Sequence, residues 1–326
     1  MRGGYSIDFI SDNSFKRYFE FLLRIISEGV PIFVLVNGFL IMHKELEIKS
    51  HIKKIVKYIA LLIIWSVIQI CITALINGEH LTLSIILKNV LTTSISNKYT
   101  GVLWFLQSLI SLYIVLPLIK ALHDKDKMAY NYFFGIIIFF TWGINLLSLI
   151  NSLVNNNYIN LFISYINKFN PLENLIFVAY FMLGGYLYEY KDKIKENNKV
   201  KIIIIIIGLI SLILSFTYGV YFSKLKNKVI AGNFNYGTIF LAAFILCLYV
   251  IASNINIKNE IARKIISSIG SSTLGIYFVH ILVIRFLHHL AFWPNKKLLT
   301  IITTFVISYL LTIVLKKIPI LKKLVS

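Results

Sequence analysis

The chain has 326 residues, of which 58% are hydrophobic and only 14% are charged, and its mean hydropathy is +0.78. A composition this apolar cannot fold behind one water-facing surface, which excludes an ordinary soluble domain. The formal net charge of +19 is gathered in short loops between apolar runs. This distribution argues against a nucleic-acid-binding surface.

Apolar runs recur along the whole chain, and nine of them are long enough to cross about 30 Å of hydrocarbon. In chain order they cover residues 21–42, 55–76, 102–122, 130–150, 172–190, 202–222, 236–252, 265–290 and 298–315. Backbone groups in lipid need internal partners, and these runs are too long and too uniformly apolar for barrel strands. The sequence therefore predicts an all-α polytopic membrane bundle, with residues 1–326 forming a single domain.

The segments between these runs carry further expectations. Residues 158–169 are apolar but short, so we expect them at the membrane interface or in an outer loop, with re-entry into the membrane as the alternative. Residues 1–20 contain no apolar signal-peptide core, so the spans themselves should direct insertion. Cys71 and Cys247 fall inside expected spans and are interpreted as small packed side chains rather than a disulfide or metal site.

The basic residues predict the orientation of the bundle. Twenty of the 33 Lys and Arg residues lie in alternate loops and at the C-terminus, eleven lie on the opposite side, and two lie inside spans. The positive-inside rule places the richer set in the cytoplasm, namely the loops at 43–57, 120–129, 191–201 and 254–264 and the C-terminus. The basic patches would then face anionic lipid headgroups or an anionic cytosolic substrate.

This orientation leaves the tail of residues 1–20 outside, with Arg2, Lys16 and Arg17 in it. A short tail can cross the membrane unaided. A tail with three basic residues and no leader is, however, more typical of an outer loop that has lost the helix before it, and this is the expectation we adopt.

Four stretches, in order along the chain, resemble one known family. They are EGVPIFVLVNGFL at 28–40, the basic stretch 51–57 leading into LLIIWS at 61–66, LWFL at 103–106 with Tyr113 and Pro117, and GSSTLGIYFVH at 270–280. Their order and spacing are similar to the acyltransferase-3 family from its second helix to its end. The resemblance therefore covers nearly the whole chain.

The resemblance implies an integral membrane enzyme that transfers an acyl group, usually acetyl from acetyl-CoA, to sugar hydroxyls of cell-surface polysaccharides. Family members typically have one span more than the nine expected here. Their first helix carries an Arg and a His generally regarded as catalytic, and neither has a counterpart in this chain. Val102 stands where the family often has another His, and Lys53 or Lys54 stands in for an expected Arg. The resemblance thus also implies a truncated chain with impaired activity.

Transfer from a thioester needs a base, a means of stabilising the oxyanion and cations for the CoA phosphates. Glu28 and Arg24, one helical turn apart, could form an ion pair. Alternatively, they could line the pocket for the acceptor sugar, where Glu28 is a candidate catalytic residue that would orient the base. His280 shares a helix face with Tyr277 and Thr273. His280 could be a hydrogen-bonded packed imidazole, or a general base or substrate contact, with Tyr277 beside it as a substrate contact.

Other candidates lie near the ends of expected spans. Lys53 and Lys54, with Lys49 and Lys57, could fix the orientation of the chain or bind the CoA phosphates. Trp104 and Tyr113 could belong to an aromatic belt or contact the sugar.

Two other functions remain open on the sequence alone. One is an exporter of polysaccharide or lipid-linked sugar, which inverted repeats would favour, and the other is a non-catalytic membrane partner. The sequence contains no phosphate loop, paired zinc-type cysteines or nucleophile elbow, so we expect no metal cofactor. The abundance of Ile, Lys and Asn is compatible with a low-GC bacterial source.

Overall fold

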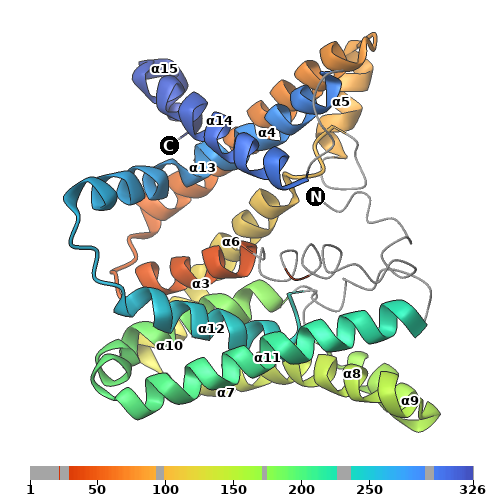
Figure 1. Ribbon diagram of the computed structural model, residues 1–326, viewed down its shortest axis with the longest axis vertical. Coiled ribbons are helices and arrows are strands. Elements are labelled where there is room, and N and C mark those ends of the chain that lie inside the picture. The colour runs from red at the N-terminus through yellow and green to blue at the C-terminus, as the bar shows by residue number, and fades with distance from the viewer. Residues whose placement is uncertain are drawn as a thin grey trace. The chain divides into compact units, whose positions relative to one another are not determined.

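The computed structural model describes residues 22, 29–92, 99–170, 175–225, 236–290 and 297–325. Within these ranges the chain forms helices joined by turns, and they contain no β-strand (Figure 1). Helices satisfy the backbone hydrogen bonds inside each segment, as lipid requires. The expected all-α polytopic bundle is confirmed.

Six of the described helices are long and apolar enough to cross a membrane. They are α4 (Ile48–Asn77), α6 (Trp104–Lys125), the continuous helix made of α7 (Lys127–Ile138), η1 (Phe139–Gly143) and α8 (Ile144–Val154), α11 (Asn198–Leu225), α13 (Glu260–His289) and α14 (Lys297–Lys317). The other three expected segments contain α3 (Gly29–Ile41), α10 (Ile176–Glu196) and α12 (Ile239–Asn254). Each of the nine segments is thus occupied by a helix, while the number of crossings stays a prediction.

Three short helices were not expected as helices: α5 (Leu83–Leu91), α9 (Asn157–Asn167) and α15 (Pro319–Val325). The Asn156 side chain accepts from the Tyr158 backbone N–H (2.8 Å) and caps the start of α9. Asn157, Asn160, Ser164 and Asn167 recur along α9 at helical spacing. An amphipathic helix of this kind suits the interfacial position expected for residues 158–169, which stays a prediction.

The described chain divides into two compact units, and the first comprises Met1–Leu46 and Val115–Ile255. In this unit α3 packs along α10, and the two helices run side by side in Figure 1. A Cβ built on Gly38 would lie 1.9 Å from the Phe181 carbonyl oxygen, and one on Gly184 would lie 2.0 Å from that of Leu35. The two backbones approach this closely only because both positions are glycine.

The pairing of α11 with α12 in the same unit also depends on a glycine. Cys247 is fully buried, and a Cβ on Gly208 would lie 2.2 Å from its Cβ. Cys247 is a free cysteine, as is Cys71 on α4. Cys247 is therefore a small packed side chain, as predicted, whereas Cys71 is half-buried and its packing role stays a prediction.

The second unit comprises Glu47–Ile114 and Asn256–Ser326. In it α13 packs against α4, where the Trp65 ring stacks on Phe278 with centroids 4.8 Å apart. Trp65 Nε1 also donates to the Leu324 carbonyl oxygen of α15 (2.9 Å), which ties the C-terminal helix to this unit. The boundary between the units falls within α6, between Ile114 and Val115. The expectation of one membrane domain stays a prediction.

Candidate functional site

Tyr277 of α13 binds the start of α6 within the second unit. The first N–H groups of a helix have no intrahelical partner, and α6 begins at Trp104. The Tyr277 hydroxyl accepts from the Leu106 N–H (3.3 Å) and donates to the Val102 carbonyl oxygen (2.7 Å). The Phe105 ring meets the Tyr277 ring edge to face at 5.6 Å. Both hydrogen-bonding functions of this hydroxyl are therefore engaged by the chain itself, so Tyr277 holds the segment that leads into Trp104.

His280 lies one turn further along α13 and is half-buried. Its Nδ1 atom lies 2.6 Å from the Tyr277 carbonyl oxygen and 3.3 Å from that of Ile276. A carbonyl oxygen can only accept, so Nδ1 must carry the proton, and the neutral ring then has its lone pair on Nε2. Nε2 has no hydrogen-bond partner among the described residues. This tautomer is the one that a general base working through Nε2 requires.

A cationic group sits where α4 faces α6. Lys54 Nζ donates to the Tyr113 hydroxyl (3.0 Å) and lies 4.6 Å from the centre of its ring. Tyr113 is 2% exposed, packs edge to face on Tyr58 (5.5 Å), and its carbonyl oxygen accepts from His51 Nε2 (2.7 Å). Burial leaves Tyr113 little surface for a sugar, and its clear effect is to orient the ammonium of Lys54. Lys53 beside it is exposed.

The remaining predicted site residues are placed as follows. Trp104 is half-buried and meets Phe105 edge to face at 6.2 Å. Thr273 is exposed and donates to carbonyl oxygens of its own helix, so only Tyr277 and His280 of the predicted polar face turn inward. Arg24 and Glu28 lie outside the described residues. Residues 1–20, on which the expectation of a missing first helix rests, also lie outside the described residues.

The structure also brings together a polar group that the sequence analysis did not single out. Arg285 Nη1 donates to the Thr73 hydroxyl and to the Tyr99 carbonyl oxygen (2.7 Å), and the Tyr99 hydroxyl donates to Glu79. One turn before Thr73 on α4, Gln69 Nε2 donates to the Phe278 carbonyl oxygen (3.3 Å). A signal existed in the sequence, because polar residues recur at helical spacing on one face of this otherwise apolar span.

A second polar network lies in the first unit, where α6, α7 and α10 meet. His123 contacts Asp124 through Nδ1 (2.7 Å) and Glu189 through Nε2 (2.6 Å). Lys127 pairs with Glu189, and the buried Lys120 donates to Asp124 (2.7 Å) and to the Met42 carbonyl oxygen (2.8 Å). Every charged group in this network pairs with a group of opposite charge. The network therefore joins the helices that carry these side chains.

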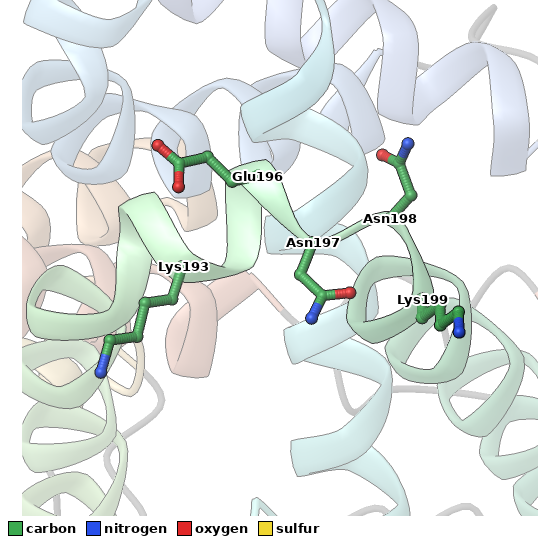
Figure 2. A pocket seen from close by; sticks show the side chains of 5 residues that line it. All are labelled: Lys193, Glu196, Asn197, Asn198 and Lys199. Atoms are coloured by element: carbon green, nitrogen blue, oxygen red, sulfur yellow. The ribbon is translucent and has the colours of Figure 1, made fainter.

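A shallow, open depression lies at the junction of α10 and α11 (Figure 2). It is lined by Lys193, Glu196, Asn197, Asn198 and Lys199. Figure 2 shows these side chains spreading apart from the turn instead of converging on one point. A ligand site needs convergent polar groups in a concave pocket, so this depression lacks what a substrate would require.

The long apolar helices identify the class of the protein, which is a multi-pass α-helical membrane protein. Within that class, residues 3–317 match the family model described as an acyltransferase domain. The chain therefore belongs to the acyltransferase-3 family and is a membrane acyltransferase, as the sequence resemblance implied. No curated protein and no solved structure matches it.

Proposed function

We propose that the protein transfers an acetyl group from acetyl-CoA to a hydroxyl of a cell-surface or lipid-linked polysaccharide, with His280 as the general base. The observation that carries this proposal is the contact of Nδ1 with the Tyr277 carbonyl oxygen (2.6 Å). It fixes the tautomer and leaves the Nε2 lone pair available for a proton.

The chemical step needs one base and one leaving group. Nε2 of His280 takes the proton of the sugar hydroxyl while the hydroxyl oxygen attacks the thioester carbonyl carbon. The carbon–sulfur bond then breaks, the acetyl ester remains on the sugar, and the proton on Nε2 passes to the CoA thiolate. Donors that stabilise the tetrahedral oxyanion would complete the site.

The donor would be held by Lys53 and Lys54. Both lie at the start of α4, in the expected cytoplasmic loop, where CoA is available. The Lys54 ammonium is directed by the Tyr113 hydroxyl (3.0 Å), and Lys53 is exposed beside it. Two ammonium groups at this position would attract the phosphates of CoA through charge.

The acceptor sugar would lie near Trp104, whose ring can stack on the apolar face of a sugar. Tyr277 fixes this segment through its bonds to Val102 and Leu106. We further propose that Arg24 and Glu28 contribute to the acceptor pocket. The C-terminus is proposed to be cytoplasmic, in line with the distribution of basic residues.

The test supplies labelled acetyl-CoA to membranes that contain the protein together with chemically de-O-acetylated envelope polysaccharide. We expect base-labile label in the carbohydrate, and we expect His280→Gln to reduce its rate by about 10²–10⁴-fold because positioned proton transfer is lost. His288→Gln is the matched control, since His288 is exposed on the same helix. Label no higher than in vector membranes would count against this reaction and favour export.

A further inference from the structure

The short C-terminal helix α15 is fixed to the second unit along its inner face. Val325 is 0% exposed, and a Cβ built on Gly275 of α13 would lie 3.0 Å from the Val325 Cβ. The Leu324 carbonyl oxygen accepts from Trp65 Nε1 of α4 (2.9 Å). Helix α15 also contacts α14. Three helices of this unit therefore hold α15 in place.

The outer face of α15 combines one large apolar side chain with two lysines. Ile320 is 77% exposed, and Lys322 and Lys323 are exposed as well. A third exposed lysine, Lys317, ends α14 just before this helix begins. The surface that α15 turns away from the bundle is thus both apolar and cationic.

The helices that contact α15 supply almost no negative charge to offset these lysines. The sequences of α4 and α14 contain no Asp or Glu. From the start of α13 to the end of the sequence, the one side-chain carboxylate is that of Glu260, and it pairs with Lys264 (3.0 Å). The charge of this face is therefore complementary to an anionic partner.

A cationic segment with an exposed apolar side chain is typical of a helix that lies in the plane of a membrane interface. The apolar side chain enters the acyl boundary, while the lysine stems extend until their ammonium groups reach the headgroup phosphates. The C-terminus is expected in the cytoplasm, and the cytoplasmic leaflet is the one that carries anionic lipids. Charge, apolar surface and expected position thus agree on one kind of partner.

We propose that α15 binds anionic phospholipids, with Lys322 and Lys323 at the headgroup phosphates and Ile320 among the acyl chains. This binding goes beyond the proposed reaction and does not depend on it. Helix α15 also follows residue 317, where the match to the family model ends. The lipid contact therefore belongs to this chain's own C-terminal segment.

Lipid bound at the outer face stabilises the contacts of the inner face, because a ligand favours the state that binds it. These contacts lead towards the proposed base. Trp65, which is bonded to Leu324, stacks on Phe278 with centroids 4.8 Å apart, and Phe278 lies two residues before His280. We therefore expect anionic lipid to stabilise the part of α13 that carries His280.

The test compares the full chain in nanodiscs of phosphatidylcholine with the full chain in phosphatidylcholine mixed with phosphatidylglycerol. The anionic lipid should raise the thermal midpoint of the wild type, more at low salt than at high salt. Lys322→Gln with Lys323→Gln should lose most of this rise. Lys193→Gln with Lys199→Gln is the matched control, since it removes the same charge from two exposed positions of the first unit, and it should keep the rise.

Two results would overturn the proposal at this stage, namely no rise in the wild type or an equal rise in both double variants. The second result would mean that the lipid responds only to net charge. CoA added to the phosphatidylcholine nanodiscs tests another source of phosphate. If CoA produces the rise and Lys322→Gln with Lys323→Gln removes it, these lysines bind CoA instead of lipid and the proposal fails.

A second measurement reports lipid contact without unfolding or turnover. Ile320→Cys, in a chain with Cys71→Ala and Cys247→Ala, carries a polarity-sensitive fluorophore at the exposed position. We expect its emission to shift to the blue when phosphatidylglycerol is included, and we expect the shift to disappear in Lys322→Gln with Lys323→Gln. Emission typical of water in both lipid compositions would contradict insertion of α15 at the interface.

Discussion

At the scale of single residues, the ammonium group of Lys54 is held in one orientation by its neighbour Tyr113. A lysine at the start of a helix usually samples many rotamers, whereas this ammonium is bound by the Tyr113 hydroxyl and lies over its ring. Tyr113 is itself fixed by burial and by the bond from His51 to its carbonyl oxygen. The charge therefore points in one direction at little further cost in side-chain entropy.

The double variant Lys53→Gln with Lys54→Gln should raise the KM for acetyl-CoA. The increase should be larger at low salt than at high salt, because ions screen an electrostatic contact with the phosphates. Steady-state kinetics in reconstituted vesicles at several salt concentrations measures this. The control is Lys193→Gln with Lys199→Gln, which removes the same charge from another loop expected in the cytoplasm. A KM that does not move would leave the first pair only a topological role.

Tyr277→Phe should reduce turnover more than it changes either KM. Without the hydroxyl, the Leu106 N–H and the Val102 carbonyl oxygen lose their partner, and the segment leading into Trp104 is held less firmly. The loss of stability should be about 1–3 kcal/mol, the cost of leaving buried groups unpaired. Tyr309→Phe, which removes a hydroxyl bonded to Ser268 (2.9 Å), provides the comparison. Equal kinetics in the two variants would assign Tyr277 to stability alone.

The sequence predicted part of this arrangement. Helical spacing placed Tyr277 and His280 on one inward face, and both are half-buried there. It could not identify the partners of Tyr277, because they are main-chain groups, which every residue possesses. The contacts of Arg285 with Thr73 and with the Tyr99 carbonyl oxygen were missed for a different reason, because these residues are far apart in sequence.

At the scale of elements, the contact of α3 with α10 depends on a reciprocal pair of glycines. Each glycine receives the backbone of the other helix, with Gly38 at Phe181 and Gly184 at Leu35. Between helices in lipid, close packing of this kind replaces the hydrophobic effect as the source of association. Any side chain at either position forces the two axes apart.

Gly184→Ala should lower stability by about 1–3 kcal/mol or more, because its methyl group would overlap the backbone of α3. Gly135→Ala is the control, since a Cβ there meets nothing within 4 Å and alanine favours a helix. Thermal unfolding of both variants in detergent distinguishes them. We expect a lower midpoint for Gly184→Ala and an equal or slightly higher one for Gly135→Ala. Equal midpoints would mean that the two helices can separate without loss.

The elements that the sequence predicted and those it missed differ in their physical origin. The nine expected segments are helical because long apolar runs have no other stable backbone in lipid. The π-helical turn η1 inside the fourth segment has no signature in residue spacing, since it reflects local packing. The short helices α5 and α15 were missed because each is shorter than a span, so a search for spans passes over them.

At the scale of the whole molecule, the distribution of charge assigns a side to each loop. Cysteines introduced at Asn156 and Lys195, in a parent chain with Cys71→Ala and Cys247→Ala, should react from opposite sides with a reagent that cannot cross the membrane. The position at Asn156 should be labelled in intact cells, and the position at Lys195 only after the membrane is opened. Labelling of both from one side would contradict the positive-inside assignment.

The glycine contact between α3 and α10 also affects the order in which the chain can fold during its synthesis. Gly38 and Gly184 are separated by 146 residues of chain, which a ribosome adding about 5–20 residues per second takes roughly 7–30 s to synthesise. During this interval α3 has no partner for its glycine face, and we expect that face to contact lipid or the insertion machinery. The nascent protein is therefore most open to mispairing, and to capture by quality control, before α10 has emerged.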